Sequence, residues 1–163
     1  MSNILIAYYS RTGVTRKVAT VLAERLDDAP VLELKETKDR GGVLGYIGAG
    51  KDALLHKKAK LVGYEQDLSA FDCVVICTPV WAFTASPPVL AFLEKERTAL
   101  TTVAFIATMS AKGDKGAFKA MGEACGQDPV ATLTLIDRAV KGDNPATMAD
   151  LDRFAKDVVA AFA

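Results

Sequence analysis

A hydroxyl-rich loop near the N-terminus is the part of the sequence best suited to binding an anion. Residues 10–15 read Ser-Arg-Thr-Gly-Val-Thr and lie between an apolar run and a helical pattern. Free backbone N–H groups and the helix dipole favour an anion at such a helix start. Ser10, Thr12 and Thr15 add hydroxyl donors, and Gly13 lets the backbone approach a phosphate closely. Because three hydroxyls exceed what a helix cap requires, the loop predicts a phosphate site rather than a turn alone.

Two later loops carry residues suited to contact with a flat ligand. The stretch after Pro79 contains Trp81, the single tryptophan, and aromatic faces favour offset stacking on planar rings. Hydrophobic capping and a protein interface are the alternatives for this stretch. The small residues from Met109 to Gly113 could pass close to a ring edge, while Asp114 is typical of a solvated acid.

Other motifs do not support a second chemistry. Residues 45–52 resemble a Walker A loop, but Asp52 stands where Ser or Thr should bind magnesium, and no buried strand precedes it. His56 is the single histidine, and its position beside two lysines favours a solvated residue over a ligand or base. No Cys, His and carboxylate cluster has metal-ligand spacing. We therefore predict no metal site and name no catalytic side chain.

Composition and charge exclude several classes of protein. The 163 residues include 20 Lys or Arg and 20 Asp or Glu, so the formal net charge is zero. A general nucleic-acid binder should have a large basic excess. Three scattered cysteines do not make a disulfide framework, and Cys73 and Cys77 fit reduced thiols in an apolar run. With no signal peptide and no stretch of about 18 apolar residues, we expect a cytoplasmic protein without a membrane span.

Alternating strands and helices must position these loops. Five apolar runs predict strands over residues 4–9, 31–34, 71–78, 101–108 and 130–136. We expect Pro79 to end the third of them. Amphipathic or capped segments predict helices over residues 14–26, from Ser86 onward, over 117–125 and over 147–162. Strands alternating with helices indicate a parallel sheet with helices on both faces. Ligands in such sheets bind beyond the carboxyl ends of the strands, where the strand order reverses.

Residues 38–63 interrupt this alternation. The segment is rich in glycine and contains six Lys or Arg residues but two Asp residues, which gives it a net charge of +4. Residues 51–61 could form a short helix. We interpret the segment as a basic, glycine-rich insert within a single domain that spans residues 1–163. A solvated face is its ordinary role, and docking of an acidic partner or a nicotinamide phosphate is the alternative.

The loops and their order resemble those of flavodoxins and flavodoxin-like FMN-binding proteins. Residues 10–15 match the Ser/Thr-x-Thr-Gly-x-Thr phosphate loop, and residues 78–93 resemble a stretch found in many of these proteins. The resemblance implies a three-layer α/β/α sandwich with a five-stranded parallel sheet in the order 2-1-3-4-5. It also implies FMN, with the first loop around the phosphate and the other two loops flanking the isoalloxazine. The implied cofactor contacts are Ser10, Arg11, Thr12, Gly13, Val14, Thr15, Thr78, Pro79, Val80, Trp81, Ala82, Phe83, Met109, Ser110, Gly113 and Asp114.

Charge is the main departure from the family pattern. Flavodoxins that carry electrons are typically strongly acidic, whereas this chain is neutral, and Arg11, Arg16 and Lys17 lie in or beside its phosphate loop. Positive charge near FMN should stabilise the reduced, anionic flavin and raise its potential. We therefore expect an FMN-binding electron-transfer flavoprotein, with an FMN-dependent NAD(P)H:quinone-type oxidoreductase as the alternative. The expected partner is a redox protein or a small quinone-like acceptor, with NAD(P)H as a further candidate.

Overall fold

Five apolar runs form the parallel sheet that the sequence predicts. The computed structural model describes residues 2–37 and 59–163. The parallel strands are β1 (Ile4–Tyr8), β2 (Val31–Glu33), β3 (Cys73–Trp81), β5 (Val103–Met109) and β6 (Thr132–Ile136). They lie in the order β2-β1-β3-β5-β6, which is the predicted order 2-1-3-4-5. A sixth, two-residue strand, β4 (Thr84–Ala85), pairs antiparallel with the end of β3.

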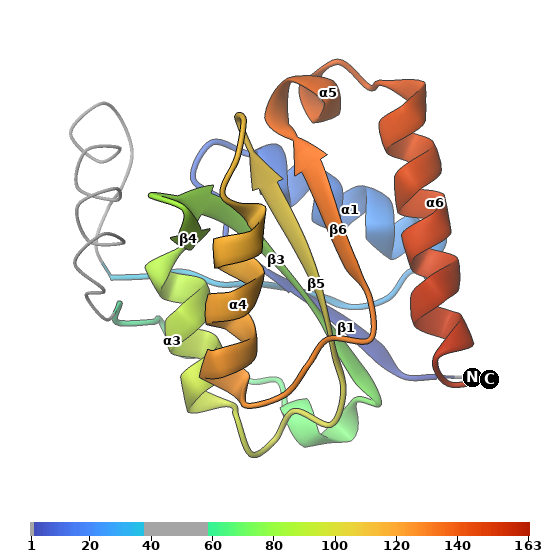
Figure 1. Cartoon of the computed structure of the whole chain (residues 1–163). Coiled ribbons are helices and arrows are strands. Elements are labelled where there is room, and N and C mark those ends of the chain that lie inside the picture. Colours follow the sequence, from blue (N-terminus) through green and yellow to red (C-terminus); the bar gives the residue numbers. More distant parts are fainter. Residues whose placement is uncertain (1, 38–58) are drawn as a thin grey trace.

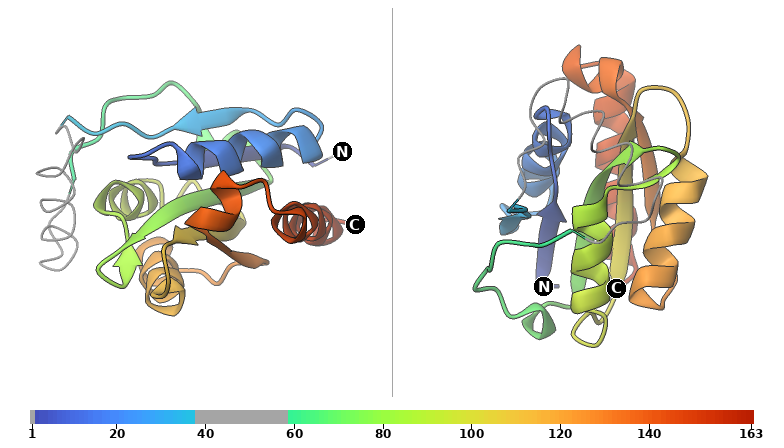
Figure 2. Two further views of the ribbon diagram at one scale, coloured as in Figure 1. Left: turned by 90° about the horizontal axis from the view of Figure 1, so that it is seen from above. Right: turned by 90° about the vertical axis from the view of Figure 1, so that its left-hand side faces the viewer.

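Side chains alternate between the two faces of the sheet. In β1, Leu5 and Ala7 belong to one buried cluster, whereas Ile4 and Ile6 belong to the other. The helical elements within residues 2–37 and 59–163 are α1 (Val14–Arg25), η1 (Leu68–Ala70), α3 (Pro87–Lys95), α4 (Asp114–Cys125), α5 (Asp137–Lys141) and α6 (Pro145–Ala160). Helices α3 and α4 cover one face, and α1 and α6 cover the other (Figures 1 and 2). The result is the predicted three-layer α/β/α sandwich.

The prediction that Pro79 ends the third strand is wrong. Strand β3 continues to Trp81 and then turns into β4, so the expected aromatic loop is a β-hairpin. Tyr9 N–H donates to the carbonyl of Cys77, which shows that the backbone N–H and C=O groups of Cys77 point toward β1. Pro79, two residues later, faces the same side, where β1 has already ended. Its missing N–H therefore breaks no sheet hydrogen bond.

Helix starts also differ from the predictions. Ser86 precedes α3 as expected, but its side chain does not cap the helix. Helix α4 begins at Asp114, three residues before the predicted start, because Gly113 adopts a left-handed conformation (φ 115°) that turns the chain into the helix. The short helix α5, directly after β6, has no counterpart among the predicted elements.

The ends of the glycine-rich segment lie side by side. Residues 38–58 are outside the described part of the chain, and with them the Walker-like motif, His56 and most of the predicted 51–61 helix. Glu36 and Leu61 form an antiparallel bridge. Thr37 N–H donates to the Lys60 carbonyl (3.1 Å), and Val62 N–H donates to the Lys35 carbonyl (2.7 Å). The insert is therefore attached beyond the carboxyl end of β2.

Across the two described stretches of chain, no helix combines the length and apolar character needed to cross a membrane.

Candidate functional site

The first turn of α1 presents backbone donors at the carboxyl edge of the sheet. Gly13 precedes the helix in a left-handed conformation (φ 97°), and no side chain caps the helix. The first helical hydrogen bond runs from Lys17 N–H to the Gly13 carbonyl (3.0 Å). The N–H groups of residues 14–16 consequently have no acceptor among the described residues. Three successive donors at a helix start, with no acidic residue in that turn, suit an anion.

Two hydroxyls add to these donors. The Ser10 hydroxyl oxygen accepts from Gly13 N–H (3.0 Å), which closes the loop and leaves its hydroxyl hydrogen to donate elsewhere. Thr12 is exposed and makes no hydrogen bond to another described residue. Val14 points into the core and can offer only its backbone N–H. Arg11 is half-buried within the loop.

Thr15 is buried, whereas its position in the loop suggested a hydroxyl that faces the phosphate. Its side chain is 2% exposed, and its hydroxyl lies 2.8 Å from the hydroxyl of Thr108 in β5. The pair ties the start of α1 to the end of β5, so the main visible role of the Thr15 hydroxyl is structural. Sequence reasoning missed Thr108, because a threonine inside an apolar strand gives no sign of a partner on a distant helix.

The cations beside the loop are paired with acids. Arg16 contacts the Glu33 carboxylate (2.5 Å) and the Tyr8 hydroxyl (3.2 Å), and the Glu33 hydrogen bond raises the pKa of Arg16. Lys17 lies 2.7 Å from the Asp143 carboxylate. Both cations that follow the loop, Arg16 and Lys17, are therefore offset by neighbouring carboxylates. This pairing weakens the prediction that they raise the potential of a ligand bound there.

The β3–β4 hairpin forms a second wall. Trp81 is 7% exposed, and its ring packs edge-on against Tyr9, with centroids 5.5 Å apart and an interplanar angle of 87°. The Tyr9 hydroxyl donates to the Glu36 carboxylate (3.0 Å). At the tip, Ala82 and Phe83 both have positive φ, and Phe83 is 61% exposed. The exposed aromatic of this loop is thus Phe83, whereas Trp81 belongs to the core.

The base of the hairpin is fixed to α3. Thr78 is fully buried, and its hydroxyl oxygen accepts from Ser86 N–H (3.1 Å) and lies 3.2 Å from the Ser86 hydroxyl. Pro79 and Val80, the next two residues, are half-buried. Thr78 therefore supports the hairpin from inside the protein, and its hydroxyl is engaged there.

The loop after β5 is held at both ends by β6 and α5. Met109 is buried, whereas Ser110 is exposed and its hydroxyl lies 3.3 Å from the Asp137 carboxylate. At the other end, the Asp114 carboxylate accepts from the Thr134 hydroxyl (2.8 Å). Asp114 is thus a structural acceptor rather than a simple solvated acid.

Asp137 is a site residue that the sequence reasoning missed. It is the first residue after β6, at the same edge of the sheet, and burial raises the pKa of its carboxyl group. Hydrogen bonding from Ser110 and the charge of Lys141 act in the opposite direction. Its position directly after an apolar run, at the carboxyl end of a predicted strand, is the sequence feature that could have identified it as a site residue.

Contacts join the three predicted loops into one site. Tyr9, after β1, touches Trp81 of the hairpin, and Thr15 bonds to β5 next to Met109. A Cβ atom on Gly113 would lie 2.7 Å from a Val80 methyl carbon and 2.9 Å from the Phe83 Cα. The hairpin and the loop after β5 are therefore in direct contact.

The N–H and hydroxyl groups at this edge suit an anion. No group of three His, Cys, Asp or Glu side chains that could hold a metal ion occurs within residues 2–37 and 59–163. Cys73, Cys77 and Cys125 are free thiols in the interior. Burial raises the pKa of both Cys73 and Cys77 to about 12, which keeps them in the unreactive thiol form.

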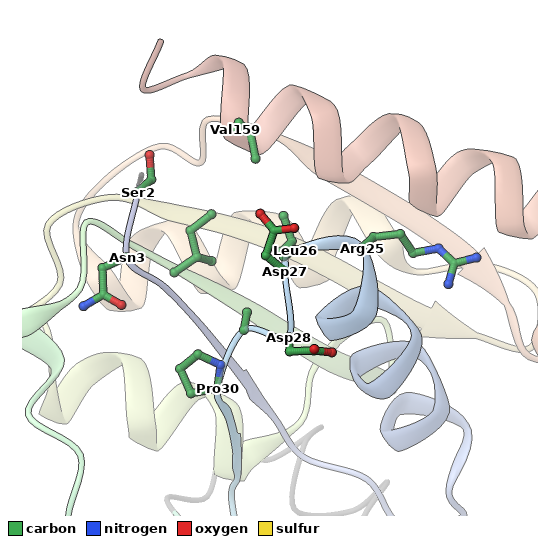
Figure 3. A pocket seen from close by; sticks show the side chains of 10 residues that line it. Ser2, Asn3, Arg25, Leu26, Asp27, Asp28, Pro30 and Val159 are labelled. Atoms are coloured by element: carbon green, nitrogen blue, oxygen red, sulfur yellow. The ribbon is translucent and has the colours of Figure 1, made fainter.

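A separate cavity lies at the opposite edge of the sheet. It has a volume of about 230 Å³ between the N-terminal segment, the turn after α1 and α6 (Figure 3). Asp27 and Asp28 line it together with Arg25, which already pairs with Asp152 (2.8 Å). None of the predicted site residues reaches this cavity.

Solved structures share this fold. A flavoprotein from Lactobacillus acidophilus in complex with FMN has a TM-score of 0.74 at 20% identity, covering 87% of this chain and 98% of its own. A flavodoxin from Fusobacterium nucleatum bound to FMN has a TM-score of 0.61 at 13% identity, covering 99% of both chains. A short-chain flavodoxin associated with a bacterial microcompartment has a TM-score of 0.62 at 14% identity over the whole of both chains. No family model and no curated protein matches the sequence. The chain therefore has the flavodoxin-like fold, as its strand order and loops predicted.

Proposed function

We propose that this chain binds FMN non-covalently at the carboxyl edge of its sheet and transfers electrons through it. The start of α1 carries this proposal: three backbone N–H groups with no acceptor among the described residues directly follow the loop that holds the hydroxyls of Ser10 and Thr12. The fold, shared with flavodoxins and with FMN-containing flavoproteins, supports the same ligand.

The residues present fit the two parts of FMN. The phosphate is anionic and matches the donors of residues 10–16, with Arg11 as a cation inside the loop. The isoalloxazine is planar and largely apolar, and we assign it to the edge formed by residues 78–83 and 109–114. These two segments supply an aromatic hairpin and a loop of small residues.

FMN, when bound, supplies the capacity to accept and donate one or two electrons. The protein holds it and limits its motion. The Thr78–Ser86 contact fixes the base of the hairpin, and the Tyr9–Trp81 contact packs its inner face. Asp137 positions the exposed Ser110 at the start of the other loop. No side chain is required as a general acid or base in this account.

The pairing of charges bears on the potential of the bound flavin. Glu33 and Asp143 offset the charges of Arg16 and Lys17, which reduces the positive charge around the proposed phosphate site. A carrier function is therefore compatible with the neutral overall charge. We further propose a single-domain, cytoplasmic protein, in keeping with its free cysteines.

Purification tests this proposal. The protein should be yellow, with one FMN per chain that acid releases. A colourless preparation that takes up no added FMN would refute the proposal.

Anaerobic reduction of the yellow protein distinguishes its electron donors. Two well-separated one-electron potentials, with no direct bleaching by NADPH, support a carrier that receives electrons from a protein. Bleaching by NADPH followed by quinone-dependent reoxidation supports the alternative reductase activity.

A further inference from the structure

The tip of the β3–β4 hairpin has an unfavourable local conformation. Ala82 and Phe83 occupy the two central positions of the turn with φ of 49° and 64°. Turns of this kind favour Asn-Gly or Gly-Gly, because a Cβ atom at positive φ is crowded by the backbone. A β-carbon on both residues, and a phenyl ring on one, therefore opposes the conformation that the hairpin adopts.

Burial does not compensate for this conformation. Phe83 is 61% exposed, so most of its ring gains nothing from the hydrophobic core. The ring lies 5.6 Å from the ammonium group of Lys112, within the range of a cation–π contact at an exposed site. Backbone strain at an exposed aromatic residue suggests a function that the isolated fold does not need.

Glycines hold the tip in place against α4. A Cβ atom on Gly116 would lie 2.1 Å from the Phe83 carbonyl oxygen, and one on Gly113 would lie 2.9 Å from the Phe83 Cα. The backbone around Phe83 thus packs directly on the first turn of α4. In Figure 1, β4 lies beside the start of α4. The exposed ring is carried on a rigid support.

Two lysines flank the same point. Lys112 lies two residues before the start of α4, and Lys115 lies in its first turn, where the helix dipole disfavours positive charge. Both are exposed, and neither forms a salt bridge with a described residue. The nearby Asp114 carboxylate bonds to Thr134 on β6, which lies across β5 from the hairpin. With Lys112, Lys115 and the one carboxylate of Asp114, residues 112–115 carry a net charge of +1, although the whole chain is neutral.

We propose that Phe83, Lys112 and Lys115 form a docking surface for an acidic redox protein. The inference rests on the proposed function, because Phe83 and Lys112 belong to the edge assigned to the flavin ring. The two lysines attract an acidic rim and accelerate encounter, and Phe83 gives an apolar contact at the centre. A partner held there is close to the ring edge and needs no further opening of the protein.

The test uses FMN-loaded, dithionite-reduced protein and two oxidised acceptor proteins of opposite charge. Stopped-flow mixing with acidic plastocyanin and with basic cytochrome c gives second-order rates across a range of ionic strength. The plastocyanin rate of the wild-type protein should fall as salt is added, because screening removes the attraction. Lys115→Glu should lower that rate about tenfold at low salt and reverse its salt dependence.

Two further variants separate docking from other effects. Lys156→Glu, on the exposed side of α6, changes the net charge by the same amount and should alter the rate less than twofold. Phe83→Gly should lower the plastocyanin rate without changing its slope against ionic strength. The proposed docking surface would be refuted by equal effects of the two lysine variants, or by a wild-type rate with plastocyanin that rises with salt. Neither result would bear on FMN binding. A chain that takes up no FMN would overturn the proposed function as well.

Discussion

The buried hydroxyl pair between Thr15 and Thr108 allows a quantitative test of how the site is built. The two oxygens lie 2.8 Å apart, and each side chain is 2% exposed. Thr15→Val or Thr108→Val keeps the shape of the side chain but leaves the opposite hydroxyl buried without its partner. Each single change should lower the free energy of unfolding by about 1 to 2 kcal/mol.

The double variant should behave differently. With both hydroxyls replaced by methyl groups of similar shape, no buried polar group is left unsatisfied, and the loss should be within about 0.5 kcal/mol of zero. Urea unfolding of the FMN-free protein, followed by circular dichroism, measures all three variants. With a urea slope of about 1 to 3 kcal/mol/M, a single variant should unfold at a urea concentration lower by roughly 0.3 to 2 M. Losses in the double variant equal to the sum of the singles would refute the pairing.

Three other predictions concern the loops. Thr12→Leu should weaken FMN binding about tenfold, or roughly 1.4 kcal/mol, in a flavin-fluorescence titration. The stability of the FMN-free protein should not change, because Thr12 is exposed. Unchanged affinity would show that the phosphate does not bind at this loop. Gly13→Ala should lower the free energy of unfolding by about 1 to 2 kcal/mol because of the positive φ alone, since no atom lies within 4 Å of the added Cβ. Gly113→Ala should lower it further, because its Cβ would also meet the hairpin, and equal thermal unfolding of the two variants would contradict this prediction. Burial raises the pKa of Asp137 in the folded state, so the folded protein binds the proton more tightly and stability should fall as pH rises above about 4 through that raised pKa. Asp137→Asn should flatten this part of the stability–pH curve, and an unchanged slope in urea unfolding would exclude Asp137 as its source.

Much of the fold could be predicted because its strands are continuous apolar runs. Both faces of a parallel strand are buried, so the runs beginning at Ile4, Cys73 and Val103 stand out from the sequence. The end of β3 could not be placed in this way, since a proline breaks a strand only at a position where a backbone N–H would have an acceptor on the neighbouring strand. That condition depends on the pairing of β1 with β3 ending at Cys77, two residues before Pro79, which is a property of the assembled sheet.

The candidate site was predictable in outline and less so in detail. Local pattern located the loop around Gly13, because hydroxyls, glycine and a helix start are neighbours in the sequence. The Thr15–Thr108 and Ser110–Asp137 contacts join residues 93 and 27 positions apart, and no local pattern reveals such pairs. The buried environment of Trp81 likewise depends on Tyr9, which lies far away in the sequence.

The central claim is that the start of α1 binds the phosphate of FMN. Comparing FMN with riboflavin, which lacks the phosphate, isolates that contact in a single titration of the FMN-free protein. FMN should bind at one per chain and at least about a hundredfold more tightly than riboflavin, roughly 2.7 kcal/mol, and Thr12→Leu should reduce that difference. Equal affinity for the two flavins, or no binding of FMN, would contradict the claim.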